Sequence, residues 1–266
     1  MSLNPQEYPR GFQSQVAGSS SAHDLVRLEL AYSASTTAPV FVLKLLSAQT
    51  PDNRLTPQLL TALLAALQHV EDTWDSILSS TTHGAALVIT GTTEGKTSKF
   101  FSNGLDFESA IADPNFFDNY LFPVYEKMLT FPIPTVASIG GHAFAAGWGL
   151  VSSCDGAVMG QKGYLCMNEV LFGAAIPLGL WAPLSTRIHT PAQKSRVVLQ
   201  AQRWSGSSAL QEGFIDVHVP EADSAAVLSK SIELAAAWAE KSKANAWGSN
   251  KVSSLCTMSV ALSLTY

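Results

Sequence analysis

The sequence predicts an α/β fold in which a mainly parallel sheet is layered with helices. Two observations predict this fold class. Short apolar and β-branched runs alternate along the chain with longer segments of helical periodicity, which is the pattern of strand–helix–strand units. The chain has 266 residues, 47% of them apolar and 14% charged, so it can bury a substantial core in one large domain or two small ones.

The N-terminal third contains a predicted tail, two strands and a long helix. Residues 1–22 are rich in Ser, Gly, Gln and Pro, which is typical of a mobile tail. Residues 24–31 alternate apolar and polar side chains and predict a half-buried strand, whereas residues 39–46 predict a buried one. Thr56-Pro57 suits a helix start, so we expect a helix from there to about Leu78. The apolar face of that helix is formed by Leu59, Leu60, Leu63, Leu64 and Leu67.

The rest of the chain continues the alternation. Further strands are predicted at residues 85–90, 99–102, 135–139, 155–159, 164–167 and 215–219. Helices are predicted at residues 114–130, 178–187, 192–201, 207–212 and 222–243. Residues 140–150 are rich in Gly and Ala. Residues 250–266 are rich in Ser and Leu, and the sequence assigns them no structure.

Composition excludes several classes of protein. The net charge of −5 provides no positive surface for nucleic acid or an anionic membrane, and no apolar run reaches the roughly 18–20 residues of a membrane span.

The first residues lack the pattern of a signal peptide, and the last three are not a Ser-Lys-Leu peroxisomal signal. Three cysteines and six histidines form no metal-ligand or disulfide spacing, so we expect buried thiols and no metal site. A cytoplasmic or peroxisomal location is expected.

Nucleotide-binding and serine-hydrolase motifs fail on spacing. Gly91-Thr-Thr-Glu-Gly-Lys-Thr97 has three residues between its glycines where a phosphate-binding loop needs four, and an extended segment follows it. A surface loop is the better interpretation. The chain contains no G-x-G-x-x-G fingerprint and no G-x-S-x-G elbow.

Three segments together indicate a catalytic site. They are Phe-Phe-Ser-Asn-Gly-Leu-Asp-Phe at residues 100–107, the stretch of residues 132–150 that leads to Cys154-Asp155, and Met-Asn-Glu-Val-Leu-Phe-Gly at residues 167–173. The first two each predict a strand, a tight glycine-bearing turn and a helix, whose leading N–H groups have no intrahelical partner. Two such turns facing each other would form a pocket for an oxyanion. Small residues would let a ligand approach the backbone: Gly104, Ala145, Ala146 and Gly147. Taken singly, each motif is better explained by close strand–helix packing.

The order and spacing of these motifs resemble the crotonase (enoyl-CoA hydratase/isomerase) superfamily over roughly residues 25–245, and most closely its Δ3,Δ2-enoyl-CoA isomerases. The resemblance implies a crotonase-like spiral of ββα turns with a C-terminal helical trimerisation region, usually assembled as trimers or hexamers. The chain would then divide into a tail at 1–22, a spiral core at 23–215 and a C-terminal helical region at 216–266.

The resemblance also implies roles for individual residues. The N–H groups of Leu105 and Ala146 would hold the thioester oxygen, and Glu169 matches the proton-transferring glutamate of the family. Family hydratases carry a second glutamate where this chain has Gly149, so a lone base would shuttle a proton from C2 to C4 of a 3-enoyl thioester.

Coenzyme A would enter as part of the substrate, and no separate cofactor is expected. The substrate-binding residues implied by the resemblance are Ser102, Asn103, Gly104, Asp106 and Gly147. Lys96 and Lys99 are candidate phosphate contacts, while the Asp106 and Asp155 carboxylates are expected to make turn or cap hydrogen bonds. Candidate walls of the acyl pocket are Phe107, Phe116, Phe117, Trp148 and Phe172, although aromatic residues are more often plain core.

Two alternatives stay open at this stage. The same fold could catalyse hydration, thioester hydrolysis, decarboxylation or a biosynthetic tailoring step on an acyl-CoA. It could also be a non-catalytic acyl-CoA-binding homologue, an idea to which the unusual residues 250–266 give some weight. Neither nucleic acid nor a membrane is expected as a partner. The chain is expected to assemble as a homotrimer or hexamer.

Overall fold

The computed structural model describes Phe12–Gln13 and residues 25–33, 36, 38–47, 50–78, 84–91, 99–221 and 223–263, with the backbone alone at 12–13 and 255–263. Most of the predicted tail therefore lies outside the described residues. So do residues 92–97 of the motif that begins at Gly91, Lys96 among them.

The larger sheet has seven strands in the order β1-β2-β3-β4-β6-β8-β11. Their bounds are β1 (Phe12–Gln13), β2 (Val26–Tyr32), β3 (Pro39–Leu45), β4 (Ala86–Thr90), β6 (Thr135–Ile139), β8 (Gly156–Gly160) and β11 (Val217–Val219). From β3 to β11 every pairing is parallel, with Val42 opposite Val88 and Val88 opposite Val136, while β1-β2-β3 pair antiparallel at one edge. The prediction of mainly parallel pairing is thus confirmed.

A second sheet of four strands runs in the order β10-β9-β7-β5. Its strands are β5 (Phe100–Ser102), β7 (His142–Phe144), β9 (Tyr164–Cys166) and β10 (Trp204–Ser205). In the order of described elements, β5, β7 and β9 each come after a strand of the larger sheet, pair in parallel and lead into helical segments. This strand–strand–helix succession, repeated three times, is the predicted ββα spiral.

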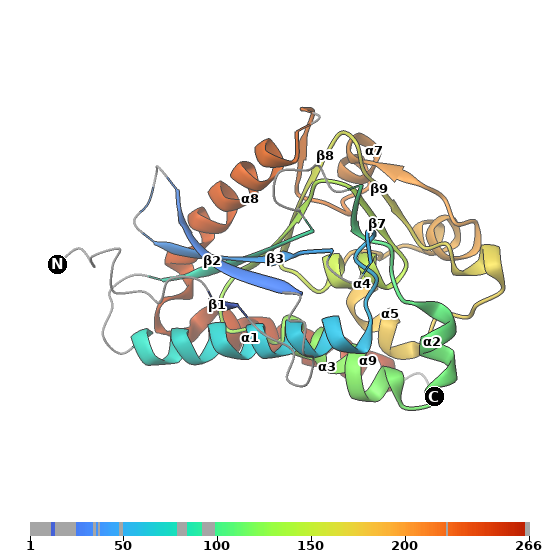
Figure 1. Ribbon diagram of the computed structural model, residues 1–266, viewed down its shortest axis with the longest axis horizontal. Coiled ribbons are helices and arrows are strands. Elements are labelled where there is room, and N and C mark those ends of the chain that lie inside the picture. Colours follow the sequence, from blue (N-terminus) through green and yellow to red (C-terminus); the bar gives the residue numbers. More distant parts are fainter. Residues whose placement is uncertain are drawn as a thin grey trace.

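Helices cover both faces of the larger sheet (Figure 1). Alternate side chains of β3 supply the two cores: Phe41 and Leu43 pack with the leucines of α1 (Pro57–Leu78), whereas Val40 and Val42 pack with α8 (Ser224–Ala239). The predicted start of α1 is confirmed, because the Leu59 N–H donates to Thr56 Oγ1 at 3.2 Å.

The remaining helical segments differ from the expected ones at several places. Their bounds are α2 (Phe107–Ala112), η1 (Phe117–Leu121), α3 (Phe122–Leu129), α4 (Ala146–Ser152), η2 (Glu169–Phe172), α5 (Leu178–Leu184), α6 (Pro191–Lys194), η3 (Ser195–Leu199), α7 (Gly206–Gln211), η4 (Glu240–Asn245) and α9 (Ala246–Ser263). The helix expected at 114–130 begins with the π-helical turn η1 and continues as α3, whereas the helix expected at 192–201 begins as α6 and ends with the π-helical turn η3. Of the unassigned stretch, the described residues 250–263 belong to the long helix α9.

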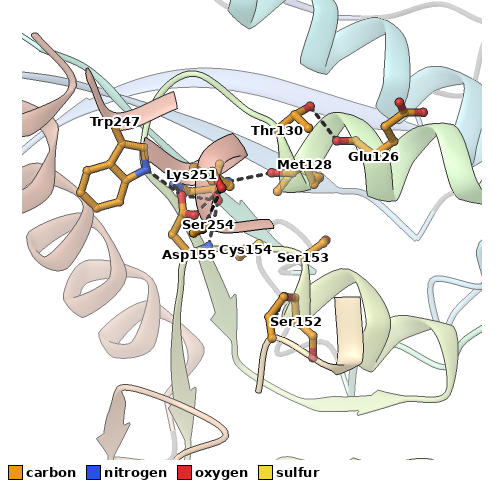
Figure 2. Close-up of polar contacts among 12 residues, drawn as sticks. Glu126, Met128, Thr130, Ser152, Ser153, Cys154, Asp155, Trp247, Lys251 and Ser254 are labelled. Carbon is orange, nitrogen blue, oxygen red and sulfur yellow. Dashed lines mark hydrogen bonds and ion pairs between the residues drawn. The ribbon is translucent and has the colours of Figure 1, made fainter. Parts of the chain in front are cut away.

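Helix α9 is fastened to the core through Asp155 (Figure 2). Lys251 Nζ lies 2.8 Å from Asp155 Oδ1 and donates to the Met128 carbonyl at 2.8 Å, and Trp247 Nε1 donates to Asp155 Oδ2 at 3.1 Å. The same Oδ2 accepts hydrogen bonds from the N–H and hydroxyl of Thr135. Asp155 therefore has the structural role expected of it, and its partners explain why a Ser-rich segment docks as a helix.

Candidate active site

Two strand-to-helix turns meet at one edge of the small sheet. β5 and β7 are parallel neighbours, so the turns that follow them emerge side by side. The first turn contains Gly104 at φ +80°, and its carbonyl accepts from the Leu55 N–H at 2.8 Å. The second contains Ala145 at φ 51° and ψ −129°, whose N–H donates to the Cys166 carbonyl at 2.9 Å.

The two turns touch through their backbones. A Cβ atom added to Gly104 would lie 2.8 Å from the Ala145 Cβ and 3.4 Å from the Ala146 nitrogen, and one added to Gly147 would lie 2.5 Å from the Ser102 carbonyl oxygen. Only glycine fits such approaches. Among the described residues, neither the Leu105 N–H nor the Ala146 N–H has a hydrogen-bond acceptor, and both residues line the same cavity.

Glu169 is a buried carboxylate on that cavity. It begins the 3-10 helix η2, which is separated from the end of β9 by two residues, and the residue is 7% exposed. Within the described part of the chain, its Oε2 is buried and has no hydrogen-bond partner. Burial raises the pKa of Glu169 to about 7, against a smaller lowering by its own backbone N–H. A carboxyl group with this pKa can accept and return a proton near neutral pH.

The cavity has a volume of about 550 Å³. Its wall combines the residues of all three motifs with α2, η1 and α5: Arg54, Asn103, Leu105, Asp106, Phe107, Glu108, Phe117, Ala145, Ala146, Asn168, Glu169, Phe172, Ala174, Ala175, Pro177 and Leu180. Phe107 and Phe172 meet edge to face with ring centroids 5.2 Å apart, and so connect the first motif to the third. The space has the mixture of an apolar wall and a few polar groups that small-molecule sites share.

The other predicted substrate-binding residues divide into two groups. Asn103 and Asp106 line the cavity, and the Asp106 carboxylate accepts from the Ser109 hydroxyl at 2.7 Å. Ser102, Gly104 and Gly147 lie behind the wall, where the Ser102 hydroxyl donates to the Asn53 carbonyl at 2.8 Å.

The candidate aromatic walls also divide. Phe107, Phe117 and Phe172 line the cavity, but Trp148 and Phe116 are fully buried and absent from its lining. Trp148 instead packs edge to face on Phe214. Lys99 is exposed over the Phe100 ring and does not line the cavity.

Sequence reasoning missed three residues near the site. Arg54 lines the cavity with its guanidinium 3.8 Å from an Asp106 carboxylate oxygen. Tyr125 and Leu180 enclose Gly149, where an added Cβ would lie 2.5 Å from the Tyr125 hydroxyl and 2.5 Å from Leu180 Cδ1. Tyr125 and Leu180 lie in plain apolar helical patterns, and no local signal distinguishes them from core residues.

The described residues contain neither a metal-binding cluster nor a helix that could span a membrane. No group of three or more His, Cys, Asp or Glu side chains there is arranged to hold a metal ion. None of the described helices combines the length and apolar character that crossing a bilayer requires.

Comparison with known proteins gives consistent matches. The family model for enoyl-CoA hydratase/isomerase matches residues 36–251. The curated Arabidopsis thaliana protein enoyl-CoA delta isomerase 1, peroxisomal, is 31% identical over 181 residues, covering 66% of this chain and 70% of the relative. Enoyl-CoA delta isomerase 2, peroxisomal, of the same plant is 28% identical over 214 residues, covering 77% and 82%.

Solved structures share the fold. A Mycobacterium tuberculosis structure named as a probable enoyl-CoA hydratase superposes with a TM-score of 0.68 at 25% identity, covering 86% of this chain and 89% of the other. A second structure, named as an apo enoyl-CoA isomerase, gives a TM-score of 0.66 at 23% identity, covering 90% and 98%. With the family model matching most of its length, this chain belongs to the enoyl-CoA hydratase/isomerase family.

Proposed function

We propose that this protein is an enoyl-CoA isomerase that moves the double bond of a 3-enoyl-CoA to the 2-trans position. The observation that carries the proposal is the buried carboxylate of Glu169, on a cavity that is also lined by two residues whose amides have no acceptor in the described part of the chain. The relatives named enoyl-CoA delta isomerases support the same reaction. Gly149 supports isomerisation over hydration, because the position of the second hydratase glutamate has no side chain and no room for one.

The Leu105 and Ala146 N–H groups would bind the thioester oxygen. As C2 loses a proton, negative charge moves onto that oxygen and the amides stabilise the resulting enolate. Losing one donor of such a hole costs about 3–4 kcal/mol of transition-state stabilisation. Because the donors belong to the backbone, side chains as different as Leu and Ala serve equally well.

Glu169 would carry the proton between the two carbons. Its carboxylate takes the proton from C2, the C2–H electron pair forms the C1–C2 double bond of the enolate, and Glu169 becomes a neutral acid. The enolate then collapses to form C2=C3, the old C3=C4 pair takes the proton at C4, and Glu169 is again a carboxylate. A pKa near 7 suits both halves of this transfer. A positioned general base contributes roughly 100- to 10,000-fold.

The substrate would be an acyl-CoA, as the family implies, with coenzyme A bound as part of the substrate. Asn103 and Asp106 on the cavity wall, with Ser102, Gly104 and Gly147 behind them, form the proposed region for its coenzyme A portion. Phe107, Phe117 and Phe172 would then face the acyl chain.

A homotrimer or hexamer is the proposed assembly. Large apolar side chains stand exposed near the third motif, with Leu171 and Leu199 each 69% exposed and Leu178 87% exposed. Exposed apolar surface of this kind marks interaction sites. Light scattering on the purified protein tests the proposal, which a monomeric mass would contradict.

The proposed compartment is the peroxisome or the cytoplasm. Two Arabidopsis relatives carry the word peroxisomal in their names, which favours the former. Imaging a fluorescent fusion against a peroxisomal marker distinguishes the two, and fluorescence confined to any other compartment would contradict both.

Turnover of a panel of 3-enoyl-CoA thioesters of varied chain length tests the function. We expect formation of 2-trans-enoyl-CoA, its loss in Glu169→Gln with folding intact, and normal rates in Glu126→Gln, which changes an exposed carboxylate on α3. Water addition to crotonyl-CoA is measured in parallel. Hydration as the dominant reaction, or acyl-CoA binding without turnover of any thioester, would contradict the proposal.

A further inference from the structure

Tyr125 is a fully enclosed side chain whose hydroxyl contacts the second turn of the site. It lies on α3 and is 2% exposed. Its Oη donates a hydrogen bond of 2.7 Å to the Ala146 carbonyl, which lies in the first turn of α4. Ala146 supplies a proposed oxyanion donor through its N–H. Its carbonyl group is held by a side chain of a different helix, α3.

The turn that Tyr125 holds is strained. Ala145, immediately before Ala146, has φ 51° and ψ −129°, a conformation that side-chain-bearing residues rarely adopt. Such a conformation persists only when its surroundings fix it. Two hydrogen bonds flank it here, from the Ala145 N–H to the Cys166 carbonyl at 2.9 Å and from the Tyr125 hydroxyl to the Ala146 carbonyl.

Tyr125 also fills the space over Gly149. A Cβ atom at that position would lie 2.5 Å from Oη and 2.9 Å from Cζ of the tyrosine, and 2.5 Å from Leu180 Cδ1. Tyr125 and Gly149 are thus complementary, since the ring occupies the volume that a side chain at 149 would need. After burial, the nearby Glu169 charge is the second cause that raises the pKa of Tyr125, so the hydroxyl lies within electrostatic reach of the proposed base and stays protonated.

We propose that Tyr125 is a positioning residue of the active site, whose hydroxyl holds the Ala145–Ala146 turn so that the Ala146 N–H faces the cavity, and whose ring excludes any acid from position 149. This inference rests on the proposed isomerase function. Tyr125 touches no reacting atom. It acts by orienting the Ala146 N–H and by occupying the volume that a second catalytic side chain at position 149 would need.

Tyr125→Phe removes the hydroxyl and keeps the ring. One buried hydrogen bond is worth about 1 kcal/mol, which corresponds to a rate ratio of about fivefold, so we expect kcat to fall about fivefold. KM should change less than twofold, because the Ala146 donor matters most when charge develops on the oxygen. The pH midpoint of activity should stay where it is in the wild type, because the phenylalanine ring preserves the burial of Glu169. Tyr120→Phe is the matched control, a half-buried tyrosine in η1 that packs on Phe116, and it should keep wild-type kcat.

Gly149→Ala tests the same contact from the other side. Its methyl group would push the hydroxyl away from Ala146, so we expect a fall in kcat of similar size to that of Tyr125→Phe. In the doubly substituted protein the combined loss should be smaller than the product of the two single losses, since both remove one interaction. Losses that multiply independently would overturn the shared contact.

A measurement without turnover separates this inference from the proposed function. Acetoacetyl-CoA carries an acidic C2, and its enolate absorbs in the ultraviolet, so the fraction bound as enolate reports on the oxyanion donors. We expect Tyr125→Phe to reduce that fraction severalfold while butyryl-CoA, which forms no enolate, binds with unchanged affinity. A kcat within twofold of wild type, an equal loss in Tyr120→Phe, or an unchanged enolate fraction would overturn the role of Tyr125. If the wild-type protein is inactive on every 3-enoyl-CoA, the proposed isomerase function is refuted instead. The measurement of the bound enolate fraction would still decide the role of Tyr125.

Discussion

Gly104 and Ala146, on different turns of the spiral, approach so closely that a Cβ atom on the glycine would lie 3.4 Å from the alanine nitrogen. The contact follows from the parallel pairing of β5 with β7, which brings both turns to one edge of the small sheet. It places the amides of Leu105 and Ala146, neither of which has an acceptor among the residues that the structure describes, on one cavity with Glu169.

Gly104→Ala should separate these two turns. Its positive φ of +80° would strain any side chain, at a cost of roughly 1–3 kcal/mol, and the new methyl would meet the Ala145 Cβ at 2.8 Å. We expect isomerase kcat to fall about 100-fold or more, as for loss of an oxyanion donor. Gly213→Ala is the control, because Gly213 has φ +78° but open space around its Cβ position. It should lose similar stability in urea denaturation and keep its activity, and equal activity losses would argue against the contact.

The rate of isomerisation should depend on pH through Glu169. Burial holds the pKa of this carboxyl at about 7, and the proposed base acts as the carboxylate. We therefore expect kcat/KM to rise with pH, to reach half its maximum near pH 7, and to fall about tenfold per pH unit below that. Initial rates between pH 5 and 8.5 check this, and a profile that is flat from pH 5 to 7 would exclude Glu169 as the base.

Glu169 should also make the protein less stable as pH rises. Its folded pKa of about 7 lies above the ordinary 4.5, so between these values the folded state holds a proton that the unfolded chain has lost. The free energy of unfolding should fall through this window by roughly 3 kcal/mol, and Glu169→Gln should remove that part of the pH dependence. Urea denaturation at pH 5 and pH 8 measures the difference, with Glu126→Gln expected to retain the wild-type slope. An unchanged slope in Glu169→Gln would show that the carboxylate is solvated.

Lys251→Met should loosen helix α9. The Lys251–Asp155 ion pair is largely buried, with side chains 10% and 15% exposed, and removing one partner of such a pair costs about 3 kcal/mol. We place the expected loss at the lower end for buried pairs because Asp155 Oδ2 keeps its bonds from Thr135 and Trp247. Lys230→Met breaks the exposed Lys230–Glu233 pair of α8 and should cost less than about 0.5 kcal/mol. Thermal and urea denaturation compare the two variants, and similar losses would mean that Lys251 does not anchor α9.

Local sequence patterns were sufficient to predict the helices and strands whose formation depends on neighbouring residues in the chain. Thr56-Pro57 starts α1 because a side-chain oxygen and a fixed φ act within one turn of helix. The β-branched run of β3 is buried on both faces because parallel strands are covered on both sides. By contrast, the π-helical turns η1, at the start of one helical segment, and η3, at the end of another, lie where the periodicity gives no sign of a change in helix type. The nearly uniform Ser/Leu stretch becomes α9 where Lys251 and Trp247 meet Asp155, far away in the sequence.

Residue patterns alone were enough to predict the family, the spiral of strands and helices, and the three motifs that contain Leu105, Ala146 and Glu169, because turn preferences and glycine spacing are properties of consecutive residues. The packing of distant segments was needed to establish which aromatic rings face the cavity, that Trp148 belongs to the core, and that Tyr125 contacts both Ala146 and Gly149. Those outcomes depend on how α3, α4 and α5 pack together (Figure 1). An apolar helical pattern predicts that one face of a helix is buried. Which side chains contact each other depends on close packing between segments that are distant in the sequence.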